Sequence, residues 1–239
     1  IYTNLMTKVS VLKITEFIHQ HPDLKNCKVI LGGPEIRYNA ENYLLNGADM
    51  LVVGEGEQTF FEIADHVKTN NVLPTEVAGT AYLQNKTVFF TPERTLIKDV
   101  NVLPMPARNK IDLTLYGNAW KQHHGYSMYS LSTMRGCPYT CKWCSRAVYG
   151  GTYRRRSAKL VVDELAYLKQ NYDPDRVWFV DDVFTISHKW MNEFKEEILK
   201  RQVFIPYEII TRADRLNEDI IKILKETDCF RVWIGEESG

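Results

Sequence analysis

The sequence predicts an α/β protein in which two series of alternating strands and helices flank an irregular segment. Between residues 8 and 92, short apolar runs alternate with amphipathic stretches. Residues 93–125 contain two closely spaced prolines and no sustained period, which is typical of a linker. From Tyr126 a second alternation yields four strand–helix repeats. Such alternation favours parallel sheets covered by helices.

The amino-terminal half predicts helix–strand pairs that end in a hairpin. In chain order these are a helix at 9–21, a strand at 28–33, a short helix at 40–47, a strand at 48–54, a helix at 55–69, and two strands within 79–92 around Gln84, Asn85 and Lys86. The alternation indicates a parallel, doubly wound sheet, whose ligands bind beyond the carboxyl ends of the strands.

The carboxyl-terminal half predicts a parallel (β/α) barrel or part of one. Its expected strands are 126–134, 176–182, 204–212 and 230–238, and its expected helices are about 157–171, 188–201 and 217–227. Residue 1 is Ile, and the final residues IGEESG directly follow an apolar run. We therefore expect both ends to cut through structure and the chain to be part of a longer polypeptide.

Composition narrows the class of protein. The 30 basic and 30 acidic residues give no net charge, which argues against a general nucleic-acid or membrane-surface binder. The chain has no apolar run long enough to span a membrane and no signal-peptide pattern, so we expect a cytoplasmic protein. Thiols stay reduced there, and clustered cysteines are then metal ligands or catalytic groups. Cys27 and Cys229 stand alone and are expected to be ordinary buried small residues.

Three cysteines, Cys137, Cys141 and Cys144, lie in a C-x-x-x-C-x-x-C pattern directly after the first strand of the second series. Structural zinc takes four protein ligands, and no fourth cysteine or histidine follows closely. An iron–sulfur cluster held by three thiolates leaves one iron open to a substrate or cofactor. The spacing therefore favours a reactive cluster over a structural metal site.

This pattern after the first strand of a βα barrel, with Trp143 before the last cysteine, resembles the radical S-adenosylmethionine (SAM) superfamily. The resemblance implies that Cys137, Cys141 and Cys144 hold a 4Fe-4S cluster, that the open iron binds SAM, and that reductive cleavage yields a 5'-deoxyadenosyl radical. It also places Trp143 near the adenine.

Residues around the cysteines suit such a loop. Gly136 and Pro138 shape a tight turn that brings backbone amides toward the cluster sulfurs. Positive side chains in the loop either offset the charge of the cluster or are solvated; they are Arg135, Lys142 and Arg146. The run Arg154, Arg155 and Arg156 either contacts anionic groups or is solvated, and Ser157 is expected to cap the next helix.

Charged residues at the ends of the later strands match positions that bind SAM in the family. Asp181 and Asp182 end the second strand and would hold the amino group, although aspartate there could equally cap a helix. Arg212 ends the third strand and would pair with the carboxylate. Glu237, next to Glu236, ends the fourth and would bind the ribose. Two consecutive aspartates at the end of the second strand resemble the form that this position takes in the cobalamin-linked branch of the superfamily.

Paired glycines follow both strands of the first series, namely Gly32, Gly33, Gly54 and Gly56. Alone they would more often serve turns, but with the linker and the cysteine loop they resemble the cobalamin-binding Rossmann-like domain of cobalamin-dependent radical SAM proteins. Some such domains carry an Asp-x-His-x-x-Gly segment, which this chain lacks.

The resemblance implies an α/β chain with a partial Rossmann-like cobalamin-binding domain at 1–92, a linker at 93–125 and a partial radical SAM (β/α) barrel at 126–239. The implied activity is cobalamin-dependent methyl transfer to an unactivated centre of a small molecule, with an external electron donor such as ferredoxin or flavodoxin. Alternatives are radical cyclisation or oxidation of a tetrapyrrole-like or other biosynthetic intermediate, as in the anaerobic magnesium-protoporphyrin ester cyclase branch, or a non-catalytic cobalamin or iron–sulfur binding module.

Overall fold

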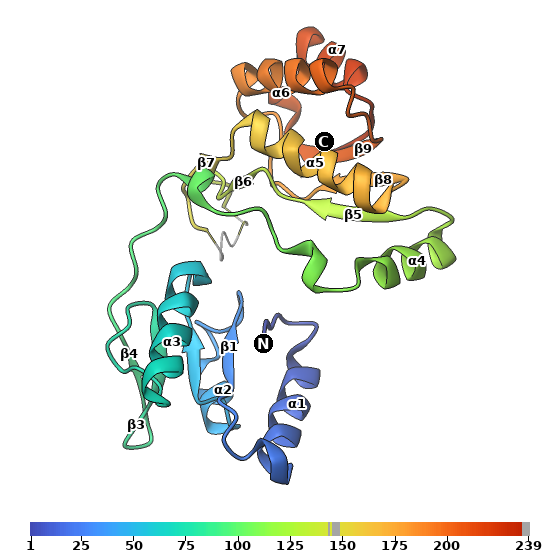
Figure 1. Ribbon diagram of the computed structural model, residues 1–239. Coiled ribbons are helices and arrows are strands. Elements are labelled where there is room, and N and C mark those ends of the chain that lie inside the picture. The colour runs from blue at the N-terminus through green and yellow to red at the C-terminus, as the bar shows by residue number, and fades with distance from the viewer. Residues whose placement is uncertain (143, 145–148, 236–239) are drawn as a thin grey trace. The chain divides into compact units, whose positions relative to one another are not determined.

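The structure is a computed structural model that describes residues 1–142, 144 and 149–235 (Figure 1). The described residues form two compact units. The first takes in Ile1–Ile97 together with Cys144, Tyr149 and Gly150, and the second takes in Lys98–Lys142 and the described residues from Gly151 onward. Each unit has its own sheet and its own core, so each is described separately.

The first unit is a four-stranded sheet in the order β1-β2-β3-β4 with helices on both faces. Its elements are α1 (Lys8–Gln20), β1 (Ile30–Gly32), α2 (Ala40–Leu45), β2 (Met50–Val52), α3 (Gly56–Asn70), β3 (Thr80–Gln84) and β4 (Thr87–Phe90). Side chains of β2 point alternately to the two faces, as a pleated strand requires. Leu51 packs in the core that α1 and α2 cover, whereas Met50 and Val52 pack with Ile63 of α3.

The expected parallel sheet is only half parallel. β1 and β2 pair in parallel, but β3 pairs antiparallel with β2, and β4 antiparallel with β3. The predicted hairpin is confirmed, and its two turn residues, Asn85 and Lys86, have φ angles of 51° and 64°. Two consecutive left-handed residues match the twist of the flanking strands. The hairpin then adds to the edge of β2, which makes the sheet mixed.

The second unit is a parallel four-stranded sheet in the order β10-β9-β8-β5, with a separate two-stranded pair, β6 and β7. Its elements are α4 (Leu113–His124), β5 (Met128–Leu131), β6 (Met134–Arg135), β7 (Arg154–Arg155), α5 (Ala158–Tyr172), β8 (Arg176–Phe179), α6 (His188–Arg201), β9 (Tyr207–Thr211), α7 (Glu218–Glu226) and β10 (Cys229–Ile234). These strands and the helices after them confirm the predicted βα repeats.

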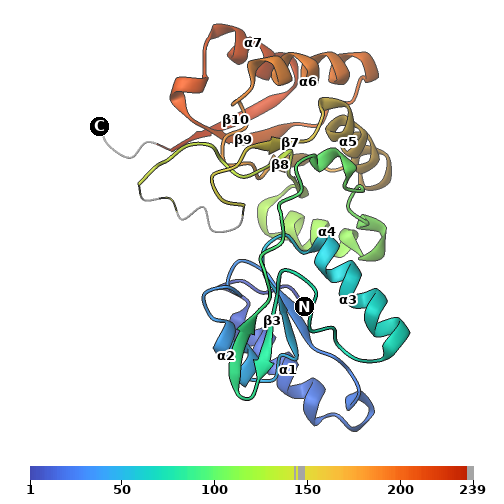
Figure 2. The same ribbon diagram turned by 90° about the vertical axis from the view of Figure 1, so that its left-hand side faces the viewer.

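Helices α5, α6 and α7 lie on one face of the parallel sheet (Figures 1 and 2). Their apolar side chains form one core with the strands, in which Phe179, Phe194 and Tyr207 are almost fully buried. Each helix begins at a side chain that accepts a backbone N–H two or three residues on, a standard N-cap. Ser157, predicted as such a cap, accepts from Leu160, and Ser187 and Asn217 act in the same way for α6 and α7.

The segment 93–125, expected to be an irregular linker, contains the twelve-residue helix α4. Asp112 caps α4 by accepting from Thr114 N at 3.1 Å, and α4 packs against β5. Gly117 permits this contact, because a Cβ at this position would lie 2.2 Å from the Tyr129 hydroxyl. The helix was not predicted because its sequence contains a glycine, a poor helix former, and has no sustained apolar period.

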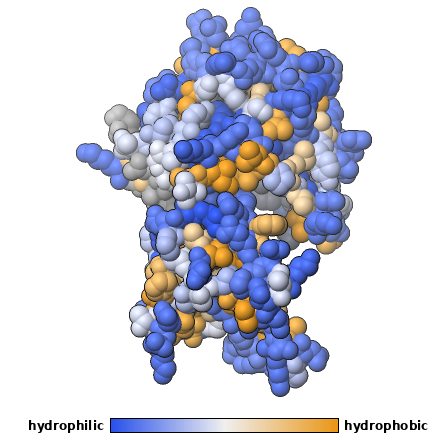
Figure 3. Space-filling model, turned by 60° about the vertical axis from the view of Figure 1, so that its left-hand side comes forward, coloured by the Kyte–Doolittle hydropathy of each residue, from blue (hydrophilic) through white to orange (hydrophobic). Residues whose placement is uncertain are grey.

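No helix in the described ranges is both long enough and apolar enough to cross a membrane. On the face drawn in Figure 3, hydrophilic side chains dominate and hydrophobic ones occur in small scattered groups.

Candidate active site at a loop of three cysteines

The cysteine loop leaves the carboxyl end of β5 and returns before α5, and a short antiparallel pair closes its base. In this pair Met134 lies opposite Arg155, and Arg135 lies opposite Arg154. The loop proper begins at Gly136, which has a φ of 77°. A Cβ at Gly136 would lie 2.2 Å from the Thr152 carbonyl oxygen, so only glycine lets the two ends of the loop approach this closely. The sequence prediction that Gly136 shapes a tight turn is confirmed.

All five cysteines are free thiols. Cys137 is buried, while Cys141 and Cys144 are partly exposed. Among the residues that the structure describes, no three His, Cys, Asp or Glu side chains lie close enough to hold a metal ion. Three free thiols within eight residues are nevertheless the kind of donor set that holds an iron–sulfur cluster and leaves one iron open.

Arg212, directly after β9, contacts this loop. Its Nη1 donates to Cys141 Sγ at 3.7 Å, and its guanidinium lies 4.3 Å from the ring centre of Tyr139. The side-chain hydrogen bond to Asp214 is the main cause of the raised pKa of Arg212. This contact places a positive charge directly beside one of the three thiols.

The structure gives Asp181 a role different from the predicted contact with SAM. Its carboxylate is buried, with the residue 2% exposed, and both oxygens are used inside the protein. Oδ1 accepts from the backbone of Thr133 at 2.8 Å and of Met134 at 3.2 Å, and from Ser132 Oγ at 3.1 Å. Oδ2 accepts from the Thr133 hydroxyl and lies 3.9 Å from Arg155 Nη2. Burial raises the pKa of Asp181 against the lowering effect of Arg155 and these donors.

Asp182, the next residue, is exposed, whereas Asp181 is buried. Asp182 lies in the bend that follows β8, at the carboxyl end of the parallel sheet, and Arg212 directly follows the neighbouring strand β9. Of the two acidic residues, Asp182 is therefore the one available to a ligand. Four further residues predicted for this half lie outside the described residues: Trp143, Arg146, Glu236 and Glu237.

The three consecutive arginines are not equivalent. Only 5% of the Arg155 side chain is exposed, and its guanidinium lies 3.5 Å from the ring centre of Trp190 and donates to the Phe184 carbonyl at 2.7 Å. Burial lowers the pKa of Arg155, with Asp181 opposing that change. Arg156 pairs with the buried carboxylate of Glu164 at 2.5 Å. Both side chains thus have internal partners, which the sequence offered only as ligand contacts or solvated charges.

Glu164 was missed by the sequence analysis. It lies on α5, 1% exposed, and it binds two arginines from different segments, Arg108 at 2.6 Å and Arg156. These arginines in turn donate to the carbonyls of Ser130 and Ser132 at the end of β5. An acidic residue on the apolar face of a helix could have indicated this role, because a charge that is buried there is almost always paired.

In the first unit the paired glycines follow β1 and β2, two parallel neighbours whose carboxyl ends lie at the same edge. Backbone packing alone requires a glycine at position 33, since a Cβ there would lie 1.9 Å from the Thr3 carbonyl oxygen. Gly54 has a φ of 88° and open space where its Cβ would be, and Gly32 and Gly56 show only ordinary or slightly tight contacts. Of these four glycines, Gly54 is thus the one with open space beside its backbone.

The two lone cysteines differ from expectation. Cys27 is exposed, which corrects the prediction that it is buried, because it lies in the turn before β1 and not on the strand. Cys229 is partly buried at the start of β10, and burial raises its pKa to about 12.

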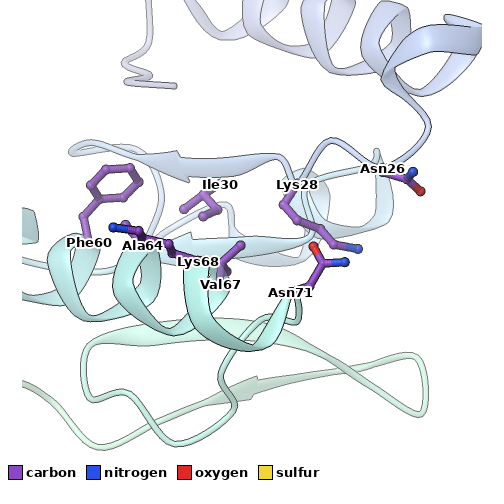
Figure 4. Close-up of a pocket in the computed structure, with 8 residues that line it drawn as sticks. All are labelled: Asn26, Lys28, Ile30, Phe60, Ala64, Val67, Lys68 and Asn71. Carbon is purple, nitrogen blue, oxygen red and sulfur yellow. The ribbon is translucent and has the colours of Figure 1, made fainter.

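A pocket of the first unit lies between α3 and the start of β1 (Figure 4). Its polar residues include Asn26 and Lys28, which precede β1, and Lys68 and Asn71 at the end of α3. These positions are at the amino ends of the strands, opposite to the glycine edge. The pocket is therefore separate from the glycine edge of the same unit.

Comparison with known proteins identifies the class. Residues 131–239 match the Radical SAM superfamily, and this part of the chain belongs to that superfamily. The chain is 30% identical over 233 residues to an uncharacterized methyltransferase of Pyrococcus horikoshii, covering 96% of this chain and 48% of that protein. It is 24% identical over 232 residues to the anaerobic magnesium-protoporphyrin IX monomethyl ester cyclase of Synechocystis sp., covering 95% of this chain and 45% of the cyclase. The chain thus spans about half the length of the curated relatives it matches.

The fold matches that of the cobalamin-dependent SAM radical enzyme OxsB, whose solved structure has aqua-cobalamin and SAM bound. The TM-score is 0.78 with 20% identity, and the match covers all of this chain and 35% of OxsB. The order along the chain, an α/β unit followed by a parallel βα unit, is therefore a fold shared with OxsB.

Proposed function

We propose that the chain is the cofactor-binding part of a cobalamin-dependent radical SAM enzyme that transfers a methyl group to an unactivated centre of a small molecule. The observation that carries the proposal is the loop of three free cysteines at the carboxyl end of the first strand of a parallel sheet, in a chain whose second half belongs to the radical SAM superfamily. When bound, the cluster and cobalamin would supply the electron that cleaves SAM and the carrier of the methyl group.

Within this proposal Cys137, Cys141 and Cys144 hold the 4Fe-4S cluster. Asp182 is exposed at the end of β8 and binds the amino group of SAM, while Arg212 at the end of β9 binds its carboxylate. Trp143 and Glu237 are proposed for the adenine and the ribose.

The first unit is proposed to bind cobalamin at the edge formed by Gly32, Gly33, Gly54 and Gly56. Positive φ at Gly54, with open space around it, lets the backbone approach a large flat ligand. Glu55 supports that loop, because its carboxylate accepts from the backbone N–H of Ile97 at 3.0 Å.

An enzyme of this kind needs a reductant, and we propose an external electron donor such as ferredoxin or flavodoxin. We place the protein in the cytoplasm, a proposal supported by five free cysteines and no disulfide among them. The absence of net charge gives no support to nucleic acid as a substrate.

The test is anaerobic reconstitution of the full chain with iron and sulfide, followed by SAM and dithionite. We expect about four irons per chain and release of 5'-deoxyadenosine. Cys137→Ala, Cys141→Ala or Cys144→Ala should each abolish the visible cluster absorption, whereas Cys27→Ala and Cys229→Ala should leave it unchanged. A cluster that forms without SAM cleavage would indicate a non-catalytic module.

A second candidate is radical cyclisation or oxidation, favoured by the similarity to the anaerobic cyclase. Methyl transfer from SAM leaves S-adenosylhomocysteine, so the cobalamin-loaded chain should form that product in addition to 5'-deoxyadenosine. Release of 5'-deoxyadenosine alone would support the cyclase-type reaction and contradict the methyltransferase.

A further inference from the structure

The base of the cysteine loop is closed by residues of three separate elements. The backbones of β6 and β7 pair at Met134 and Arg155, and one further bond runs from Arg156 N to the Thr133 carbonyl at 2.9 Å. Asp181 from the end of β8 then accepts two backbone N–H groups on the β6 side. We call this arrangement of Thr133–Arg135, Arg154–Arg156 and Asp181 the loop clasp.

Asp181 is the centre of the loop clasp. Its two oxygens accept four hydrogen bonds from Ser132, Thr133 and Met134, so it fixes the chain direction three to five residues before Cys137. The side chain of Arg155 on the opposite strand faces the same carboxylate at 3.9 Å and is stacked on Trp190. One buried carboxylate thereby links both strands of the clasp to β8.

A buried carboxylate with this many donors orders the chain strongly. Charge-assisted hydrogen bonds are stronger than neutral ones, and their loss inside a protein leaves donors unsatisfied. Thr133 is itself fully buried, so water cannot replace the missing acceptor without opening the clasp. The loop that carries the thiols therefore depends on Asp181 for its entry direction.

We propose that Asp181 is a positioning residue that holds the cysteine loop in the shape that receives the cluster, and that it does not itself contact SAM. The proposal rests on the proposed function in taking Cys137 and Cys141 as cluster ligands. It assigns the two adjacent aspartates separate tasks, with Asp181 ordering the loop from within and Asp182 facing the ligand.

The test compares Asp181→Asn with the matched control Asp182→Asn in the full chain without metal. The readout is the alkylation rate of each thiol at one pH, followed by peptide mass spectrometry. In Asp181→Asn we expect Cys137 to react at least about tenfold faster, the factor by which loss of one such hydrogen bond changes an equilibrium. Asp182→Asn should leave the rate of Cys137 at the parent value.

Cys229 is the internal control for global unfolding, because it lies on β10, away from the clasp in sequence, and is partly buried. Its rate should not change in Asp181→Asn. Equal acceleration of Cys137 and Cys229 would show that Asp181 merely stabilises the fold, and an unchanged rate of Cys137 would show that the clasp does not control the loop. Either result overturns the proposal.

A milder variant, Thr133→Val, removes one donor to Asp181 and keeps the backbone bonds. It should accelerate Cys137 selectively but less than Asp181→Asn. After reconstitution, Asp181→Asn should hold less iron than the parent, while the affinity of its remaining clusters for SAM stays unchanged. These thiol rates need neither iron nor SAM, so they remain decisive even if reconstitution shows that the protein binds no cluster.

Discussion

Replacing Glu164 with Ala should destabilise the second unit more than any exposed charge change. The Glu164 side chain is 1% exposed and carries one arginine on each oxygen, Arg108 on Oε1 and Arg156 on Oε2. Those arginine side chains are only 13% and 19% exposed. Removing the carboxylate leaves two mostly buried cations without their counter-ion.

The magnitude follows from these contacts. Breaking a buried ion pair costs about 3–5 kcal/mol. Arg108 and Arg156 retain bonds to the carbonyls of Ser130 at 3.0 Å and Ser132 at 3.2 Å, which favours the lower end. We therefore expect a loss of about 3 kcal/mol, or roughly 6–12 °C in Tm for a chain of this size.

The assay is urea denaturation followed by tryptophan fluorescence, because all five tryptophans lie after residue 97 and report on the second half of the chain. Glu193→Ala is the control, since Glu193 forms an exposed pair with Lys189 at 3.8 Å on the adjacent helix α6. That variant should change the unfolding free energy by less than about 1 kcal/mol. If Glu164→Ala were as stable as Glu193→Ala, the two arginines would not depend on the buried carboxylate.

Further predictions concern the site and the ionisable groups. Arg212→Ala should keep the reconstituted cluster and weaken SAM binding by about 1–3 kcal/mol, measured by equilibrium dialysis, and unchanged affinity would restrict Arg212 to its contacts with Tyr139 and Cys141. Hydrogen bonds from Ser127 and Lys121 lower the pKa of Asp175 to about 2 from 3.8, so its stabilising effect is present above about pH 4 and is lost as the pH falls toward 2. Asp175→Asn should therefore flatten the pH dependence of Tm in that window, and an unchanged slope would contradict this. Cys229, with its pKa raised to about 12 by burial, should react with iodoacetamide at pH 8 far more slowly than exposed Cys27, and equal rates would refute the burial effect.

Much of the second unit could be predicted from the sequence because its signals are local. Apolar alternation, cap residues such as Ser157 and the lengths of the repeats depend on neighbours within a few residues, and the observed strands and helices follow them closely. The motif Cys137, Cys141 and Cys144 is likewise a matter of spacing along the chain. Its chemistry follows from three thiols without a fourth ligand.

Other features depended on contacts between residues far apart in sequence. The hairpin at Asn85 and Lys86 was visible, but its addition to β2 in antiparallel direction was not, since pairing is set by the assembled sheet. Helix α4 has a weak pattern and is positioned by the contact of Gly117 with Tyr129 on β5.

Asp181 and Asp182 show most clearly which features can be predicted from the sequence and which depend on the fold. The order of residues alone predicts that two carboxylates end a strand close to the cysteine loop, and it thereby indicates where a ligand site would form. Which carboxylate turns inward is set by the fold, because the backbone donors that Asp181 binds, in Thr133 and Met134, lie more than 40 residues earlier in the chain. The same holds for Arg155 and Arg156, whose partners Asp181 and Glu164 come from other elements. Burial of a charge is decided by the partners that the fold brings to it, and a sequence shows the charge without the partner.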